Sequence, residues 1–342
     1  AGRYGEKRPG ESENKNGKVR KIKMKRFLSA LMTLCLVLSL SACAVAEDAV
    51  RVYALMGPTG IGMVQMMDQN DGTYAFTLSG APDEVVAAVA SGNADIAAVP
   101  TNLAATLYQK TSGNVQLLAL NTLGVLSILT TDDSIQTVED LAGKTIYATG
   151  QGSTPEYVLN YILDAFGLTD SVTVEYKAEH AELATLAAAG EVDIAMLPEP
   201  NVTSVLMQND QFRIALDVTE LFNQAAELKG QAGAVMSMGG VIVRKDFAQA
   251  NPEKVAAFME AYAASVEFVN SHVEAASKMV EEQGIMPKAT VAAKAIPNCH
   301  IVFITGEEMK AQIEPFFQVL FDANPASVGG ALPGADFYYM AE

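Results

Sequence analysis

Tryptophan is absent from the 342-residue sequence, and histidine and cysteine occur only three times each. The histidines, His180, His272 and His300, are scattered along the chain without the short spacing that metal ligands use. Cys299 lies beside His300, but no acidic residue adjoins the pair, so a buried thiol is favoured over a nucleophile. The sequence therefore offers little to catalysis or metal binding, and we expect no enzyme activity, no metal and no cofactor.

Negative charge dominates the composition, with 40 acidic against 23 basic residues and a formal net charge of −17. The first 42 residues are the exception, because they hold ten basic and three acidic residues. Subtracting these leaves 13 basic and 37 acidic residues in the rest of the chain, a net charge of −24. Such a surface repels phosphate backbones, so we expect no nucleic-acid partner.

A basic start followed by a short apolar run marks the N-terminal region. Lys25 and Arg26 follow Met24, and residues 27–40 are almost entirely apolar. This run is shorter than the roughly 20 apolar residues that span a bilayer, and it is typical of a secretory signal. We expect residues 24–42 to be a signal peptide. The polar, basic segment 1–23 is interpreted as a non-native or over-extended stretch that takes no part in the fold.

The run ends in Leu40-Ser41-Ala42-Cys43. These four residues resemble the lipobox of bacterial lipoproteins, in which the cysteine is acylated and the chain is cut just before it. The resemblance implies that Cys43 becomes a lipid-anchored N-terminus on the outer face of the cell membrane. An ordinary signal peptide, cut after Ala42 or Ala46, is the alternative.

Removal of this leader would leave one cysteine in the folded part of the chain. Cys35 lies in the apolar run and Cys43 at the cut, so Cys299 has no partner for an intramolecular disulfide. The fold must then rest on its hydrophobic core. A chain of this length can supply one, arranged as two lobes.

From Val50 onward, strand-like and helix-like stretches alternate. Strands are predicted at 51–55, 74–78, 94–99, 144–148, 172–176 and 192–197, with helices between them. This alternation predicts βαβ units and mostly parallel sheets. Beyond Pro252 the pattern is almost entirely helical, which indicates a helical tail that packs on the first lobe.

The two halves of the alternating region also match in sequence. Segment 91–100 aligns with segment 189–198 at a constant offset of 98, and both contain Gly-x-x-Asp before an apolar strand. The same offset pairs Glu84 with Glu182 without a gap. We interpret the match as two copies of one α/β lobe. The alternative is that this step is a common way to join a helix to a buried strand.

Four motifs lie at comparable places in these two halves. They are Gly57-Pro58-Thr59-Gly60-Ile61-Gly62; Gly92-x-x-Asp95-Ile96-Ala97 with Pro100-Thr101-Asn102; Val138-Glu139-Asp140-Leu141-Ala142-Gly143-Lys144-Thr145-Ile146 leading to Gly150-Gln151-Gly152-Ser153-Thr154; and Gly190-x-x-Asp193-Ile194-Ala195 with Pro198-Glu199-Pro200. Together they resemble the type 2 periplasmic binding proteins, over residues 48 to about 322. More narrowly, they resemble the group that binds sulfonates, nitrate, taurine and thiamine-pyrimidine precursors.

The resemblance implies an α/β fold of two Rossmann-like lobes with mixed, mostly parallel sheets, two hinge crossings and a helical C-terminal tail. The crossings would lie near 124–130 and 236–243. Lobe one would comprise 48–125 and 240–342, and lobe two 130–236. A small-molecule ligand would bind between the lobes, at the carboxyl ends of the strands.

The function that this resemblance implies is a monomeric solute-binding protein that delivers its ligand to the permease of an ABC importer. Two alternatives stay open. One is an enzyme on the same fold, similar to the yeast-type pyrimidine synthase, although that family's cysteine-rich motif is missing. The other is a ligand-sensing module of a membrane receptor.

Four strand-to-helix junctions should face the cleft, and each brings small, proline or hydroxyl residues to a helix start. The ligand-binding residues predicted there are Gly57, Pro58, Thr59, Thr101, Asn102, Gly152, Ser153, Thr154 and Glu199. The first N–H groups of a helix are unpaired and partly positive. Each hydroxyl taken singly is better explained as a helix N-cap, worth about 1 kcal/mol, but their recurrence in both halves favours binding.

The predicted ligand-binding residues point to different ligand charges. Converging N–H groups and hydroxyls suit an oxyanion such as a sulfonate or carboxylate. No Lys or Arg lies in the four junctions, and Glu199 would favour an amine, although an acid at a helix start is favourable by itself. Only Tyr53, Tyr147, Tyr157 or a phenylalanine could stack on a ring. Small sulfonates and related compounds are therefore weighted slightly above zwitterionic or pyrimidine-like ligands.

We expect labelled palmitate to enter the wild-type protein and not the Cys43→Ala variant, because the lipobox cysteine is the acylated residue. The measurement is metabolic labelling followed by gel fluorography, with Cys35→Ala as the matched control that should label normally. Equal labelling of wild type and Cys43→Ala would contradict the assignment.

Overall fold

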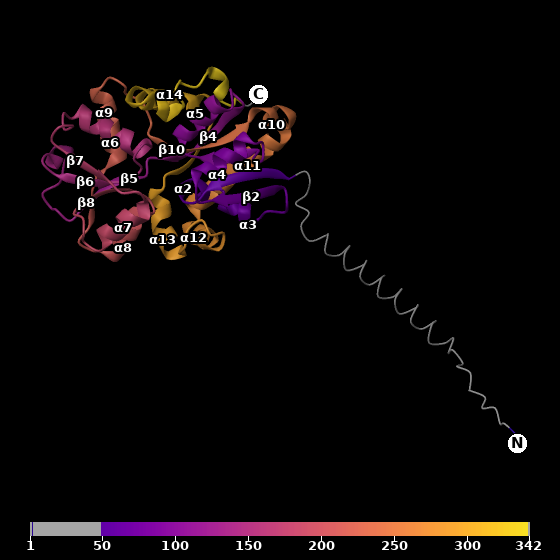
Figure 1. Ribbon diagram of the computed structural model, residues 1–342, viewed down its shortest axis with the longest axis horizontal. Coiled ribbons are helices and arrows are strands. Elements are labelled where there is room, and N and C mark those ends of the chain that lie inside the picture. The colour runs from indigo at the N-terminus through magenta and orange to yellow at the C-terminus, as the bar shows by residue number, and fades with distance from the viewer. Residues whose placement is uncertain (1, 3–48, 341–342) are drawn as a thin grey trace. The chain divides into compact units, whose positions relative to one another are not determined.

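Two β-sheets organise the chain in the computed structural model, which describes residues 49–340 and residue 2. Cys43 and the predicted segments 1–23 and 24–42 lie outside the described residues, apart from residue 2. In Figure 1, β5, β6, β7 and β8 group together, apart from the group that contains β2, β4 and β10. Among the described residues, no helix is both long and apolar enough to cross a membrane.

The first sheet has six strands in the order β11-β4-β10-β3-β1-β2 and defines lobe one. Its strands are β1 (Val50–Leu55), β2 (Tyr74–Ser79), β3 (Ile96–Val99), β4 (Val115–Leu123), β10 (Ser237–Arg244) and β11 (Ile301–Ile304). β1 runs parallel to β2 and β3, whereas β10 is antiparallel to β3 and β4. All four residues of β3 are buried, as expected for a strand covered on both faces.

The second sheet has five strands in the order β7-β6-β8-β5-β9 and defines lobe two. Its strands are β5 (Leu126–Thr130), β6 (Thr145–Ala148), β7 (Thr173–Tyr176), β8 (Ile194–Pro198) and β9 (Arg213–Asp217). β6 is parallel to β7 and β8, and β5 is antiparallel to β8 and β9. Each lobe thus has a parallel trio followed by antiparallel strands, which confirms the predicted fold class.

Helices cover both faces of each sheet. In lobe one they are α2 (Pro58–Ile61), α3 (Val64–Asp68), α4 (Pro82–Ala90), α5 (Thr101–Lys110), α10 (Lys245–Ala250), α11 (Pro252–Ser271), α12 (Val273–Glu282), α13 (Ala289–Ala295) and α14 (Gly306–Ala323). In lobe two they are α6 (Thr154–Ala165), α7 (His180–Ala188), α8 (Asn201–Gln208) and α9 (Val218–Leu228). Figure 1 places α14 beside α5, and α13 near α8.

Helix α9, between β9 and β10, is an element that the sequence analysis does not predict. Asp217 is its N-cap, and the carboxylate accepts hydrogen bonds from the backbone N–H groups of Thr219 and Glu220. The buried residues of the helix are Val218, Leu221, Phe222, Ala225 and Ala226. This spacing is the apolar stripe of an amphipathic helix. The polar residues between these positions, Thr219, Glu220, Asn223 and Gln224, hide the stripe in the sequence.

The two lobes are joined by two short crossings. The outward crossing is Gly124–Val125, because β4 ends at Leu123 and β5 begins at Leu126. A Cβ on Gly124 would lie 2.0 Å from Thr219 Oγ1 and 2.4 Å from Met236 Cε, so only glycine fits there. The return crossing leads through Met236 into β10.

Helix α14 ties the lobes together on one side. Its Phe316 ring packs edge to face against Phe222 of α9, with 5.5 Å between the ring centroids. The backbone N–H of Val235 donates to the carbonyl of Gln312 at 3.3 Å. One hydrophobic cluster accordingly includes residues of both lobes, and this packing gives the two sheets a common core on the α14 side.

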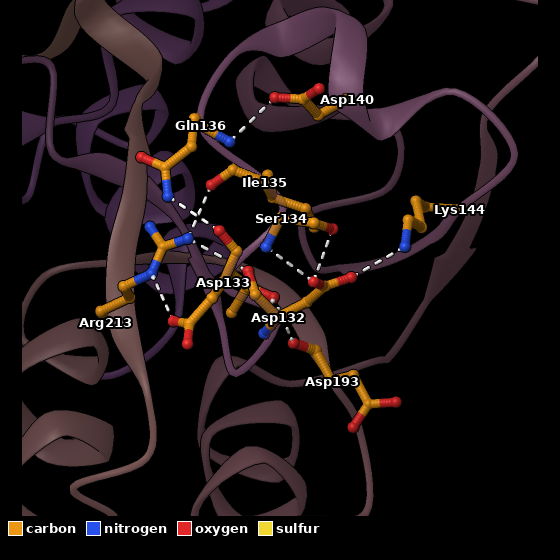
Figure 2. A network of polar contacts seen from close by, with 10 residues as sticks. Asp132, Asp133, Ser134, Ile135, Gln136, Asp140, Lys144, Asp193 and Arg213 are labelled. Atoms are coloured by element: carbon orange, nitrogen blue, oxygen red, sulfur yellow. Dashed lines mark hydrogen bonds and ion pairs between the residues drawn. The ribbon is translucent and has the colours of Figure 1, made fainter.

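A polar network fixes the loop after β5, at the end of lobe two away from lobe one (Figure 2). Lys144 Nζ lies 2.8 Å from Asp132 Oδ2, and this hydrogen bond lowers the pKa of Asp132. Arg213 Nη2 donates to the carbonyls of Asp132 and Ile135, at 3.0 and 2.7 Å. The charged groups of this network bond to one another and to backbone carbonyls of the loop, so the network is structural.

The duplicated Gly-x-x-Asp motif places its two acids in different surroundings. Asp95 is 4 % exposed, and its Oδ2 accepts hydrogen bonds from the backbone N–H and Nε of Arg51, both at 2.9 Å. Asp193 is exposed, and its carbonyl, not its carboxylate, accepts from Thr130 Oγ1 at 2.9 Å. The acid is therefore a structural anchor in lobe one and a surface residue in lobe two.

We expect Asp95→Ala to lower the free energy of unfolding by about 2 kcal/mol, because hydrogen bonds to a charged group are lost from a buried site. The matched change in the other lobe, Asp193→Ala, should stay within about 0.5 kcal/mol of wild type. Urea unfolding followed by circular dichroism measures both. Equal losses in the two variants would show that the motif has the same role in each lobe.

Candidate ligand-binding cleft

The predicted junctions of the two lobes lie at the edges where the chain crosses over. In lobe two, Pro198 at the end of β8 pairs with Leu126, the first residue of β5 after the crossing. In lobe one, Val99 at the end of β3 pairs with Gly240, near the start of β10 after the return crossing. The carboxyl ends of the parallel strands therefore face each other across the crossings, where open α/β sheets bind ligands.

The first junction, between β1 and α2, leaves an open surface. Gly57 has a φ of 93°, which favours glycine, and a Cβ there would meet no atom within 4 Å. Pro58 follows at the first position of α2. The Thr59 hydroxyl lies 3.4 Å from the Leu55 carbonyl, so it bonds back along the chain. Met56, just before Gly57, is 50 % exposed and is a residue that the sequence analysis misses.

The second junction is closed by its own contacts. Thr101 is 1 % exposed, and its Oγ1 lies 2.9 Å from Ser237 Oγ of β10. Asn102 Nδ2 donates to the Ser327 carbonyl at 3.4 Å. Both side chains thus join α5 to neighbouring parts of lobe one.

The third junction, at the start of α6, has its polar groups paired internally. The Ser153 hydroxyl donates to the Gly150 carbonyl at 2.6 Å and caps no N–H group of the helix. The backbone N–H of Gly152 donates to Glu156 Oε2 at 2.5 Å. Thr154 is buried at the first position of α6. The Gly152 N–H is therefore already bonded to a carboxylate of the protein, that of Glu156.

At the fourth junction, the start of α8, a carboxylate of the chain again accepts a hydrogen bond from a backbone N–H. Glu199 is 4 % exposed, and its Oε2 accepts from the backbone N–H of Thr203 at 3.1 Å. Its Oε1 accepts from Asn298 Nδ2 of lobe one at 3.3 Å. Burial raises the pKa of Glu199 above its ordinary value of 4.5, although these hydrogen bonds and the charge of His300 oppose the shift. Glu199 thus links the two lobes.

A cavity of about 810 Å³ opens between α6 of lobe two and the end of α14 of lobe one. It is lined by Gly152, Glu156, Tyr157, Asn160, Tyr161, Asp164, Lys229, Gln231, Val319, Asp322, Ala323 and Asn324. Its volume is in the range of small-molecule sites. Asn324 Nδ2 donates to the Tyr157 hydroxyl at 3.1 Å, and that hydroxyl donates to the Gly152 carbonyl at 3.1 Å. This chain of hydrogen bonds is a second link between the lobes.

A smaller cavity of about 110 Å³ lies at the outward crossing. It is lined by Gly124, Val125, Leu126, Ser127, Glu199, Ile214, Asp217, Asn298 and His300. Among the nine predicted ligand residues, Gly152 lines the larger cavity and Glu199 the smaller one, and the other seven line neither. The structure therefore does not bring Gly152 and Glu199 into one cavity.

Cys299 and the three histidines lie in four different surroundings. Cys299 is buried, and burial raises its thiol pKa, as does the charge of Glu199, so the predicted buried thiol is confirmed. His180 begins helix α7 and His272 precedes α12. His300 instead sits at a φ of 44° before β11 and bonds the Gly124 carbonyl at 2.5 Å.

Several lining residues escape the sequence analysis. Glu156 lies in the first turn of α6, and Asn298 and Asn324 come from the helical tail, far from lobe two in sequence. Glu156 could have been found, because an acid in the first turn of a helix is a recognisable capping signal. The two asparagines carry no local signal.

This architecture is the two-lobed α/β fold of the type 2 periplasmic binding proteins. The sequence profile of the family described as NMT1/THI5 like matches residues 76–276, more than half of the chain. The chain belongs to this family. A comparison with curated protein sequences gave no match.

Solved structures share this fold. A structure titled as an ABC transporter from Parabacteroides distasonis has 23 % identity and a TM-score of 0.73, with 86 % of this chain and 100 % of that chain covered. The aliphatic sulphonate binding protein SsuA from Escherichia coli has 17 % identity and a TM-score of 0.65, over 85 % and 96 %. The alkanesulfonate-binding SsuA from Xanthomonas axonopodis pv. citri, bound to MOPS, has 17 % identity and a TM-score of 0.60, over 84 % and 95 %.

We expect the wild-type protein to lose stability relative to Glu199→Gln as the pH rises above 4.5. Glu199 has a raised pKa when folded, so the unfolded chain releases this proton first, and ionisation within the fold is unfavourable. Below pH 4.5 the curves should converge, because both side chains are then neutral. Urea unfolding from pH 4 to pH 8 measures the difference, and parallel curves across that range would contradict it.

Proposed function

We propose that the protein is a solute-binding protein of an ABC importer, which captures a small molecule between its lobes and passes it to the permease. One observation carries this proposal. The carboxyl edges of two mixed sheets face each other across two short crossings, and a cavity of about 810 Å³ is lined from both lobes. A ligand that contacts both lobes of such a cavity can draw the lobes together around itself.

The polar contacts between the lobes favour reversible closure. One link, Asn324 to Tyr157, lies at the larger cavity, and the other, Asn298 to Glu199, lies at the smaller one. Single hydrogen bonds of this kind contribute only about 1 kcal/mol each, so binding energy can remake them. The apolar contact between Phe222 and Phe316, next to Tyr161 of the larger cavity, would act as the pivot.

The named relatives support the same role. The proteins from Escherichia coli and Xanthomonas are called sulfonate-binding, and that from Synechocystis, at a TM-score of 0.50, is called nitrate-binding. Binding of a small solute is common to these names, and the structure from Parabacteroides distasonis is called an ABC transporter. Which solute this chain binds is a separate question. A monomer anchored through lipid on Cys43, outside the cell membrane, completes the proposal.

Binding is favoured over the enzyme alternative by the state of the one nucleophile candidate. Cys299 is buried with a raised pKa, and its neighbour His300 bonds a backbone carbonyl. The described residues also hold no cluster of His, Cys, Asp and Glu that could take a metal ion. A thiol in this state is a poor nucleophile.

We expect the protein, freed of bound molecules by unfolding and refolding, to contract when given a small-molecule extract of bacterial cells. Closure of the lobes should lower the radius of gyration measured by small-angle scattering and raise Tm. The control is the same extract after passage over an excess of immobilised protein, which should have lost both effects. If the untreated extract changes neither quantity, the solute-binding proposal fails.

A further inference from the structure

We infer that the solute is an organic cation, such as a protonated amine, and that Glu156 at the mouth of the cavity recognises its charge. This inference rests on the proposed solute-binding function and specifies the substrate class of the same site. It departs from the anions named for the structural relatives.

The first argument is that both helix starts facing the cleft in lobe two already hold a carboxylate. Glu156 accepts the N–H of Gly152 at the start of α6, and Glu199 accepts the N–H of Thr203 at the start of α8. An oxyanion at either start would compete for these N–H groups and would lie beside a like charge. Glu199 is almost fully buried, so its own charge is poorly screened there.

The second argument is the charge of the cavity lining. It includes three carboxylates, from Glu156, Asp164 and Asp322, and one ammonium, from Lys229. Lys229 is paired with Asp164, so it is not available to balance a bound anion. The lining that remains is negative, and it attracts a cation.

The third argument is that a cation is already held in this cavity by the chain itself. Lys229 Nζ lies 4.9 Å from the centre of the Tyr161 ring, while the same ammonium pairs with Asp164. Tyr157 and Tyr161 both line the cavity. An aromatic face beside a carboxylate is the environment that proteins use for organic cations. Glu156 and Asp322 each accept one hydrogen bond, from the Gly152 N–H and from Gln318, and among the described residues neither is paired with a cation. Their charges are therefore left for a ligand ammonium.

The charge of Glu156 also acts on a neighbouring strand. Burial is the main cause that raises the pKa of Tyr176 to about 12, and the charge of Glu156 adds to it. Glu156 is itself only half-buried at the mouth of the cavity, with Gly152 beside it. A ligand ammonium could therefore approach this carboxylate while the Gly152 N–H stays bonded to it.

The test uses a bacterial small-molecule extract divided by ion exchange at pH 7 into cationic, anionic and neutral fractions. We expect the cationic fraction to raise Tm and the other two to leave it unchanged. If the anionic or neutral fraction raises Tm and the cationic one does not, the protein binds a solute but the inference is wrong. If no fraction raises Tm, the proposed function fails, and the inference with it.

Variants then assign the recognition to Glu156. Glu156→Gln should need about tenfold more of the cationic fraction for the same rise in Tm, because a charged contact is lost. Glu220→Gln is the matched control, since Glu220 is also an acid in the first turn of a lobe-two helix but lines neither cavity. It should behave as wild type.

A charge-conserving variant separates charge from the hydrogen bond to Gly152. Glu156→Asp keeps the negative charge on a shorter side chain, so it should retain most of the response to the cationic fraction. A loss as large as that of Glu156→Gln would show that the hydrogen bond, and not the charge, is what matters, and would overturn the assignment.

Discussion

The crossing at Gly124 is the constraint on which the remaining structure depends. Strand β4 of one sheet and strand β5 of the other are separated by two residues, so the edges of the two sheets must meet there. Thr219 and Met236 fill the space beside Gly124, and they leave room for a hydrogen atom but not for a methyl group. Strands β3 and β8 end beside the crossings. The strand-to-helix junctions that follow these two strands are therefore held close to the boundary between the lobes.

Placement at a common edge does not decide what the cleft binds. Unpaired N–H groups at a helix start can hold an anion. In this chain, Glu156 and Glu199 accept hydrogen bonds from such groups. A side chain at a helix start can therefore change the charge that a strand-to-helix junction presents, without a change of fold.

The two lobes are joined by apolar packing and by polar links. Phe316 of α14 packs against Phe222, and such apolar contact is lost only at a high cost. The hydrogen bonds from Asn324, at the end of the same helix, and from Asn298 are weaker. This combination suits a protein that keeps its lobes attached yet changes the distance between them.

The sequence by itself determined the alternating strands, the duplicated Gly-x-x-Asp step and the family, because these depend on local periodicity and on residues close in the chain. Helix α9 was also encoded locally, in the stripe from Val218 to Ala226, but its polar face concealed it. Only the tertiary structure decided the site. Thr101 turned to Ser237, 136 residues away, and Tyr157 met Asn324 across 167 residues. Contacts over such separations leave no periodic trace, since the fold and not the neighbouring sequence selects each partner.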